Sequence, residues 1–277
     1  MRKIEVRQTT LCRGEQAMSH TYTVPQPTNW NKLFEQWKFP LYFSKPVLNH
    51  LNHFLDGMLA ESSAGTLTAI HRHSWHDRDR RTLSHFLTHG KWDEAVLAHR
   101  VRITAFEQVR RHTKQVNDPI FLLLDDTVCE KTKPSSQASC SIEGAGFHHS
   151  HLRGKKVYGH AMIQAMLRTG NMVYPFAVSR YEPEGKSKIE PACDLIRQVP
   201  VSTEPTYALV DACDPSASLL QTTAKGQLGL ERYQVRSKRA IDRYWILVLV
   251  AAMCCTYLGN DHLLQGMYAY REQKTQG

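Results

Sequence analysis

The sequence contains no pair of cysteines at CxxC spacing, although it has seven cysteines, at positions 12, 129, 140, 193, 213, 254 and 255. An odd number of cysteines without paired spacing argues against a disulfide framework. It also argues against a zinc ribbon, which needs two such pairs. A reducing compartment such as the cytoplasm therefore fits this cysteine usage best.

Long apolar runs are also missing from the sequence. The longest, from Trp245 to Cys255, is shorter than the roughly 20 residues that cross a bilayer. The opening stretch MRKIEVRQTT lacks the apolar core that signal peptides carry. We therefore expect a soluble protein, and we expect its last long helix to be buried.

Acidic residues are scarce relative to basic ones. Lys and Arg number 35 against 26 Asp and Glu, which gives a net charge of +9 at pH 7 over 277 residues. Such an excess favours polyanionic partners, and double-stranded DNA is the leading candidate. The hydrophobic content of 42% is enough for a sizeable core, so the excess charge belongs to a globular protein.

Three regions with different patterns of apolar and polar residues follow one another along the chain. Residues 1–29 show no sustained periodicity, and we interpret them as a loose leader. From residue 30 to residue 117 apolar residues recur at helical spacing, which predicts a helical domain. From residue 118 to residue 277 short apolar runs alternate with polar residues, which predicts an α/β domain.

The helical region carries two stretches, RHSWHDRDRRTLSHFL and AHRVRITAFEQVRRHTK, in which basic residues stand between apolar anchors. This pattern is typical of helices that present a basic face to phosphates, and a solvated charged surface is the alternative interpretation. The candidate DNA-binding residues of the whole chain are Arg78, Arg80, Arg81, Arg100, Arg102, Arg110, Arg111, Lys155, Lys156, Lys238 and Arg239.

Four apolar runs in the second half predict strands: IFLLLD, KVYGHAMIQAML, NMVYPFAVSRY and TYALVD. We expect the first three to form an antiparallel meander with a turn at residues 168–171. KSKIEPACDLIRQV then predicts a crossover helix, after which the fourth strand lies parallel to the first. The stretch SSQASCSIEGAGF is interpreted as a polar loop. The expected fold class is therefore a mixed α/β sheet behind an N-terminal helical domain.

The first and the fourth predicted strand both end in an aspartate, Asp125 and Asp211. If these strands are parallel neighbours, both carboxylates emerge at the same edge of the sheet. Two ionised carboxylates about 4 Å apart repel by about 1 kcal/mol in water and by several times that near a protein interior, so the pair requires a cation. Mg²⁺ or Mn²⁺, bound through oxygen, supplies it, as in metal-dependent phosphoryl transfer.

A third carboxylate normally completes such a site, and Asp242 in KRAIDRYWILVLV is the candidate because it stands near the start of an apolar helix. Tyr233 and Arg236 lie just upstream, and an arginine there is suited to grip a phosphate with two hydrogen bonds. Each aspartate taken alone is better explained as a strand-end or helix-start residue. Their combination is what favours a functional site.

Several stretches, taken in order, resemble a known family. FSKPVLNHLNHFLDGML, RTLSHFLTHGKWDEAVL, LLLDDTVCEKT, IEGAGFHHSHLRGKKVYGH, YPFAVSRYE and IDRYWILV are similar to bacterial insertion-sequence transposases of the DDE type, in the DDE superfamily endonuclease group. The resemblance covers roughly residues 44–258. It implies an RNase H-like core behind a helical DNA-binding region, and cutting of transposon ends with Mg²⁺ held by an Asp-Asp-Glu triad.

The resemblance also implies roles for the acidic residues. Asp125 would be the first acid and Asp211 the second, and Asp242 would occupy the place of the family's glutamate. Asp126 remains an alternative to Asp125, because successive side chains of a strand point to opposite faces and the sequence does not say which one turns toward the metal.

Other polar residues near these acids have two interpretations each. Thr127 is interpreted as a support for the site through hydrogen bonding, and His160 in YGH is either an active-site contact or a buried structural histidine. His148, His149 and His151 in HHSH have no further ligand at a convincing metal spacing. We expect those three histidines to lie in a loop that contacts DNA or solvent.

The sequence departs from the family in its C-terminal third. Asp242 is one methylene shorter than glutamate, and only 31 positions separate it from Asp211, where relatives place a further strand and often a β-rich insertion. Tyr233 and Arg236 keep the family spacing, but Ala240 stands at the next position and the later lysine is missing near ILVLVAAM. An internal deletion explains this pattern, and loss of the strand would leave the sheet with an open edge.

Three functions are compatible with these observations. The first is a DNA transposase that hydrolyses the phosphodiester at insertion-sequence ends and transfers the strand, acting in the bacterial cytoplasm at the nucleoid. The second is an inactive, internally deleted relic that only binds DNA. The third is an RNase H-like nuclease or resolvase that recognises DNA structure. Transposition pairs two ends, so a homodimer in the DNA complex is expected for the first function.

Overall fold

The computed structural model describes residues 30–60, 65–74, 78–136, 141–150, 153–181, 189–210, 228, 230, 232–260 and 262–275. The leader expected over residues 1–29 lies outside the described residues. The same is true of Asp211 and His151.

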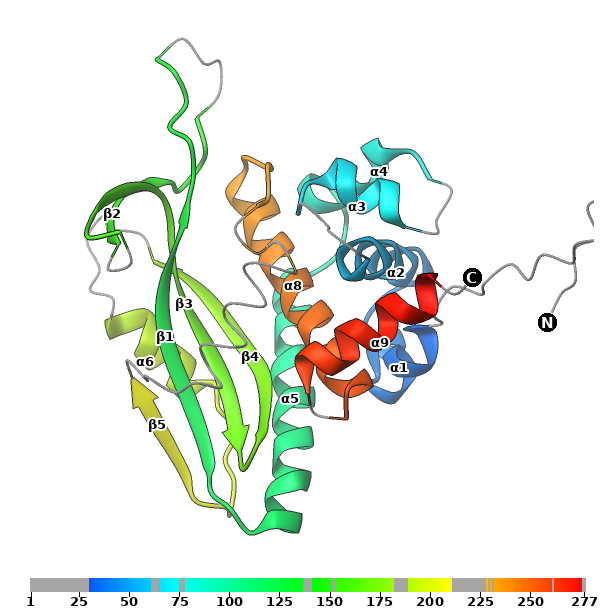
Figure 1. The fold of residues 1–277 in the computed structure, drawn as a ribbon, viewed down its shortest axis with the longest axis vertical. Helices are drawn as coiled ribbons and strands as arrows, with labels where there is room; N and C mark the ends of the chain where they lie inside the picture. The colour runs from blue at the N-terminus through cyan, green and yellow to red at the C-terminus, as the bar shows by residue number, and fades with distance from the viewer. Residues whose placement is uncertain are drawn as a thin grey trace, which may run out of the picture.

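Helices make up the described chain before the sheet (Figure 1): α1 (Trp30–Gln36), the 3-10 turn η1 (Phe39–Leu41), α2 (Lys45–Leu59), α3 (Leu67–His73), α4 (Arg80–Thr88) and α5 (Glu94–Val116). Side-chain caps set the start of α3, α4 and α5. Thr66 accepts a hydrogen bond from the N–H of Ala69 at 3.1 Å, and Asp79 and Asp93 cap α4 and α5 in the same way. Helix α5 ends at Asn117, whose left-handed φ of 56° stops the helix just before Pro119.

A five-stranded mixed sheet follows: β1 (Ile120–Glu130), β2 (Gly146–Ser150), β3 (Lys155–Thr169), β4 (Met172–Tyr181) and β5 (Thr206–Val210). Strand β3 pairs antiparallel with β1, β2 and β4, and β1 pairs parallel with β5. The order is β2-β3-β1-β5, with β4 also on β3. The expected meander, the crossover helix α6 (Ile189–Arg197) and the parallel fourth run are confirmed. The turn expected at residues 168–171 is confined to residues 170–171, because residues 168 and 169 still belong to β3 and pair with β4.

Strand β2 corrects the sequence interpretation, because Gly146, Phe147, His148 and His149 were expected in loops. Their partners come from the long strand β3, which extends past the end of β4 and offers its free edge to residues 146–150. Phe147 stacks edge to face on Tyr158 with ring centroids 5.5 Å apart, and the His148 side chain is buried. A strand of this length forms only because a distant strand pairs with it, so local sequence patterns do not reveal it.

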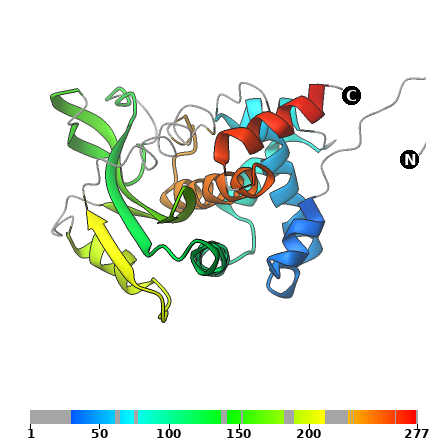
Figure 2. The same cartoon turned by 60° about the horizontal axis from the view of Figure 1, so that its bottom comes forward.

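Helices cover both sides of the sheet. Helices α5 and α8 (Lys238–Leu258) pack on one side, and α6 lies on the other (Figures 1 and 2). Helix α9 (Leu263–Thr275) packs on α8, which also contacts α2 and α4. One continuous hydrophobic cluster therefore joins the helical part to the sheet. The change of element type falls at residues 117–118, and a domain boundary at this point remains a prediction.

Helix α8 is long and apolar enough to cross a membrane by length and composition alone. In the structure, 78% of its most apolar window is buried inside the protein, which is the pattern of a core helix. Its side chains from Arg243 to Thr256 are all buried, so the expectation of a buried last long helix is confirmed for α8. Helix α8 is the element that carries the third candidate acid to the sheet.

Candidate active site

Strands β1 and β5 pair in parallel up to Leu124 and Val210, but β1 continues to Glu130 along β3, so Asp125 lies in the middle of β1 and the expectation that it ends the strand was wrong. The register pairs Leu124 of β1 with Val210 of β5, so Asp125 and Asp211 are each the residue after a paired position. Asp211 itself lies outside the described residues. The structural observation that bears on whether Asp125 and Asp211 lie close together is therefore the register of β1 and β5.

Asp125 and Asp126 lie on opposite faces of β1. Asp125 pairs with Gln164 of β3, and Gln164 lines a small cavity together with Val248 and Leu249 of α8. Because directly opposed residues of an antiparallel pair share a face, Asp125 belongs to the face that α8 covers. Asp126 is exposed on the other face. Thr127, two residues after Asp125, is buried on the same face as Asp125.

Asp242 lies in the second turn of α8 and forms an ion pair with Arg180 of β4. Arg180 Nη2 donates a hydrogen bond to Asp242 Oδ2 at 2.8 Å, and the two side chains are 5% and 37% exposed. The pair lines a pocket of about 500 Å³ between β4, α6 and α8. Other charged residues of that pocket are Glu190, Asp194 and Lys238.

Arg180 and Glu190 were not among the candidate site residues proposed from the sequence. Arg180 stands in the stretch YPFAVSRYE, where a charged residue follows a buried apolar strand, and that position was the available signal. Among the described residues, no three His, Cys, Asp or Glu side chains come together in a way that could hold a metal ion. The carboxylates of Asp125 and Asp242 are nevertheless the hard oxygen donors that Mg²⁺ and Mn²⁺ prefer.

The loop before β2 connects the start of α8 to this pocket. Glu143 Oε2 accepts a hydrogen bond from the N–H of Lys238 at 2.7 Å, and the N–H of Glu143 donates to the carbonyl of Arg236 at 3.0 Å. Gly144 follows with a left-handed φ of 71°, and a Cβ there would lie 2.8 Å from Arg180 Nη1. The left-handed backbone favours glycine at this position, and the missing side chain leaves room for the Arg180 guanidinium.

His160 is fully buried and is held by hydrogen bonds on both ring nitrogens. Its Nε2 lies 2.9 Å from the carbonyl of Glu143, and its Nδ1 lies 2.6 Å from the hydroxyl of Tyr233. Burial lowers the pKa of His160 below 6.5, the Glu143 carbonyl opposes this, and the charges of Arg180 and Lys131 lower it further. These surroundings favour the neutral form of the ring.

The contacts of His160 also indicate which of its ring nitrogens carries the hydrogen. A carbonyl can only accept, so the neutral ring carries its hydrogen on Nε2, and Tyr233 then donates to Nδ1. Lys131 Nζ lies 3.4 Å from the centroid of the Tyr233 ring and donates to the Tyr233 carbonyl at 2.9 Å. Of the two interpretations of His160, the buried structural one agrees with its contacts. Tyr233 is buried beside it, whereas Arg236 is exposed.

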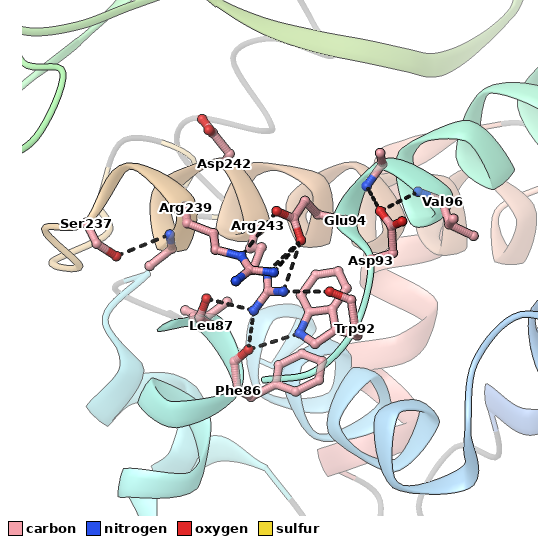
Figure 3. A network of polar contacts seen from close by, with 12 residues as sticks. Phe86, Leu87, Trp92, Asp93, Glu94, Val96, Ser237, Arg239, Asp242 and Arg243 are labelled. Carbon is pink, nitrogen blue, oxygen red and sulfur yellow. Dashed lines mark hydrogen bonds and ion pairs between the residues drawn. The ribbon is translucent and has the colours of Figure 1, made fainter. Parts of the chain in front are cut away.

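A second network anchors α8 to the helical part. Arg243 is fully buried, and its guanidinium donates to the carboxylate of Glu94 at 2.9 Å and to the carbonyls of Phe86, Leu87 and Trp92. Burial works to raise the pKa of Glu94, but hydrogen bonds from its backbone and from the two arginines more than offset this, so the pKa lies below 4.5. Figure 3 shows Arg239 and Arg243 on the side of α8 toward Glu94, with Asp242 on the other side.

The candidate DNA-binding residues differ in how far they reach solvent. Arg100 requires a correction, because it is 8% exposed, donates to the carbonyl of Trp37 at 3.0 Å and lies over the ring of Tyr42. It therefore leaves the DNA-contacting set. Arg110 and Arg239 are in ion pairs with Glu204 and Glu94. Half-buried members are Arg78, Arg102 and Arg110, and exposed members are Arg80, Arg81, Arg111, Lys155, Lys156, Lys238 and Arg239.

Helices on both sides of a mixed sheet, with a parallel strand beside β1 and an acidic residue in β1 just after the paired stretch, define an RNase H-like α/β protein. A family model described as DDE superfamily endonuclease matches residues 43–194, which is more than half of the chain. The chain belongs to the DDE superfamily endonucleases. Comparison with curated proteins gave no match, and comparison with solved structures gave none either.

Membership of this family implies nuclease or transposase chemistry, the use of divalent metal ions and DNA as a partner. The match includes Asp125, Asp126, Thr127 and His160, and it ends before Asp211 and Asp242. The family finding therefore covers the first acid and the antiparallel strands. The part of the chain that departs from the family in sequence is the part that the match leaves out.

Proposed function

We propose that the chain is a DNA transposase that hydrolyses phosphodiester bonds at insertion-sequence ends and transfers the strand to target DNA. The observation that carries the proposal is the parallel register of β1 and β5, in which Leu124 opposes Val210 and an aspartate follows each of them. A divalent ion between two such carboxylates is the usual requirement for phosphoryl transfer. The family to which the chain belongs uses the same chemistry.

In this proposal Asp125 and Asp211 are the first two metal ligands and Asp242 is the third. When bound, Mg²⁺ or Mn²⁺ would activate water and stabilise the leaving oxygen. Asp125 is preferred to Asp126 because its face of β1 is the one that α8 covers, and α8 carries Asp242. Thr127 supports β1 from the same face, and the exposed basic residues hold the phosphate backbone. We further propose a homodimer on DNA and a bacterial cytoplasmic location.

The proposal is tested by cleavage of supercoiled DNA that carries the element's own flanking ends. We expect metal-dependent nicking by the wild type, loss of at least 100-fold in rate on Asp125→Asn or Asp211→Asn, and unchanged DNA binding, because a ligand is lost without loss of the fold. Asp126→Asn is the matched control and keeps its activity. Nicking that survives in Asp211→Asn would rule out the proposed site, and loss in Asp126→Asn alone would exchange the roles of the two adjacent residues.

An inactive, internally deleted transposase is the second candidate, and the solvent exposure of the β5 side chains favours it. All five residues of β5 are exposed, with Tyr207 at 54% and Val210 at 66%, although their carbonyl and amide groups pair with β1 on one side. Within the part of the chain that the structure describes, β5 is the last strand on its side of the sheet, and an exposed, apolar edge strand is what the loss of a neighbouring strand leaves behind. DNA binding without any nicking would support this candidate, and cleavage of branched DNA regardless of end sequence would instead support a nuclease or resolvase.

A further inference from the structure

The part of the sheet formed by β2 and the first residues of β3 exposes an aromatic ring beside a cation. Phe147 of β2 is 58% exposed, although the next residue, His148, is buried. Tyr158 of β3 lies opposite Phe147 in the register and packs on it edge to face, with ring centroids 5.5 Å apart. The Lys133 ammonium lies over the Phe147 ring, 5.4 Å from its centroid. Two aromatic rings and a cation therefore share one surface.

Basic side chains continue this surface along both strands. His149 of β2 lies opposite Lys156 of β3, and both are exposed. Glu130, the exposed acid at the end of β1, is in an ion pair with Arg153 at 3.6 Å. We call this surface the outer patch, and it consists of Lys133, Phe147, His149, Lys156 and Tyr158. Its charge is positive, so it suits a polyanion.

The outer patch lies on the same face of the sheet as Asp125. Directly opposed residues of antiparallel strands share a face, and alternate residues of one strand do so as well. Asp125 lies opposite Gln164 of β3, and Tyr158 is six positions before Gln164 on that strand. The separation along β3 is about 20 Å at roughly 3.3 Å per residue, which is the length of about six stacked nucleotides. A DNA strand that passes Asp125 along β3 therefore reaches the outer patch.

We infer that the outer patch binds unpaired bases of a DNA strand, with Phe147 as the ring on which a base stacks. The inference rests on the proposed function in taking DNA as the partner, but it does not require that the chain cuts the DNA. Bases within a duplex stack on one another, so only an unpaired base can lie on the ring. Each stacked base brings a phosphate with it, and Lys133 and Lys156 are the cations beside the ring that meet it.

The combination of a ring with cations distinguishes a single strand from other occupants. One exposed apolar side chain on its own needs no explanation. The centre of a protein–protein interface is depleted in lysine, whereas Lys133 lies over the Phe147 ring. A duplex held by its phosphates requires cations and leaves an aromatic ring unused. An aromatic platform beside basic side chains is the arrangement that binds single-stranded nucleic acid.

The test is binding of the full chain, without divalent metal, to a fluorescein-labelled duplex that carries a six-nucleotide overhang, in 3′ and in 5′ polarity. The blunt duplex of the same paired sequence is the reference, and fluorescence anisotropy measures both affinities. We expect the wild type to prefer one overhang duplex, and Phe147→Ala to weaken that binding by about tenfold with little change for the blunt duplex. Phe147→Trp keeps the preference, and Tyr268→Ala, 59% exposed on α9, is the matched control that changes neither affinity.

Salt dependence separates stacking from charge in the same assay. Stacking releases no counterions, so Phe147→Ala should leave the slope of log K against log salt for the overhang duplex unchanged. Lys133→Ala should lower that slope by about 0.7, the value for one phosphate contact on a single strand. A changed slope in Phe147→Ala would contradict the role of the ring as a stacking platform.

Several results would overturn the inference, and they differ from failure of the proposed function. Equal binding of overhang and blunt duplexes by the wild type contradicts it, and so does an overhang preference that survives in Phe147→Ala. Equal weakening of both affinities also contradicts it, because the ring would then act through the fold of β2. If Phe147→Ala does not fold, Phe147→Leu keeps an apolar side chain without a ring and must lose the preference.

The nicking assay distinguishes this inference from the proposed function. A wild type that nicks element ends but has no preference for an overhang refutes the inference and leaves the proposed function in place. A wild type that prefers the overhang and nicks nothing supports the inference and refutes the proposed cleavage.

Discussion

At the scale of single residues, two arginines, Arg243 of α8 and Arg180 of β4, form ion pairs on different sides of α8. Arg243 lies on the side of α8 toward the helical part, where all of its donors meet Glu94 or backbone carbonyls. Arg180 meets Asp242 on the other side of α8. Helix α8 is thus fixed by a fully satisfied ion pair on one side and presents its acid on the other.

Glu94→Gln tests how far this ion pair stabilises the protein. The buried Arg243 would lose its counter-charge, and we expect a loss of about 2 kcal/mol in the free energy of unfolding, reduced from the fully buried case because Glu94 is 30% exposed. Urea unfolding measures it, and Glu107→Gln, exposed on the same helix, is the control. A loss equal to that of the control would show that the carbonyls alone hold Arg243.

The stability loss caused by Glu94→Gln should depend on pH, and the pKa of Glu94 determines the direction of that dependence. The folded-state pKa of Glu94 lies below its ordinary value of 4.5, so its contribution to stability is complete above that pH and is lost as the pH falls through the folded pKa. The stability difference between wild type and Glu94→Gln should therefore shrink in acid. A difference that grows on acidification would contradict the lowered pKa.

At the scale of elements, the contact between β1 and β3 positions the site. Gly159 of β3 passes so close to β1 that a Cβ would meet the carbonyl oxygen of Cys129. The neighbouring residue His160 is paired with Cys129 and bonded to Tyr233 and Glu143. The absence of a side chain at residue 159 thus allows the β1–β3 register that also presents Asp125.

Gly159→Ala is expected to destabilise the sheet by about 2 kcal/mol or more, because the added methyl group forces the two backbones apart. Thermal unfolding measures the loss, and Lys156→Ala on the same strand, which is exposed, serves as the control. Wild-type stability in Gly159→Ala would mean that β1 and β3 separate at this end without cost.

At the scale of the whole molecule, the net charge is +9, and among the described residues exposed basic side chains occur in both the helical part and the sheet. Lys155 and Lys156 at the start of β3 are exposed, whereas the side chain of Arg100 is buried. Net charge alone therefore overstates the number of cations that DNA can reach. The electrostatic part of DNA binding depends on the exposed subset.

Replacing Lys155 and Lys156 by Ala should weaken DNA binding and flatten its salt dependence. Removal of one lysine–phosphate interaction lowers the slope of log K against log salt by about 0.9, so the double variant is expected to lose roughly one to two units of slope. Fluorescence anisotropy over a salt series measures this. Lys32→Ala, exposed on α1 and outside the proposed set, should leave the slope near that of the wild type.

Several features of this protein follow from its sequence without any knowledge of long-range contacts. The apolar runs of β1, β3, β4 and β5 have local patterns strong enough to predict strands, and the helix between β4 and β5 dictates a parallel return next to β1. The family follows from short motifs in a fixed order, and its model matches the chain. These are properties of short segments and of their order, so they can be recognised before the chain is folded.

Other features depend on which distant residues meet, and the folded structure is needed to establish them. Strand β2 exists through pairing with β3, and Arg100 is an interior residue because it meets Trp37 and Tyr42. The face of Asp125 was open in the sequence and follows from the pairing with Gln164 under α8. The ion pair between Arg180 and Asp242 joins residues 62 positions apart, and burial of the arginine is the physical reason that it forms.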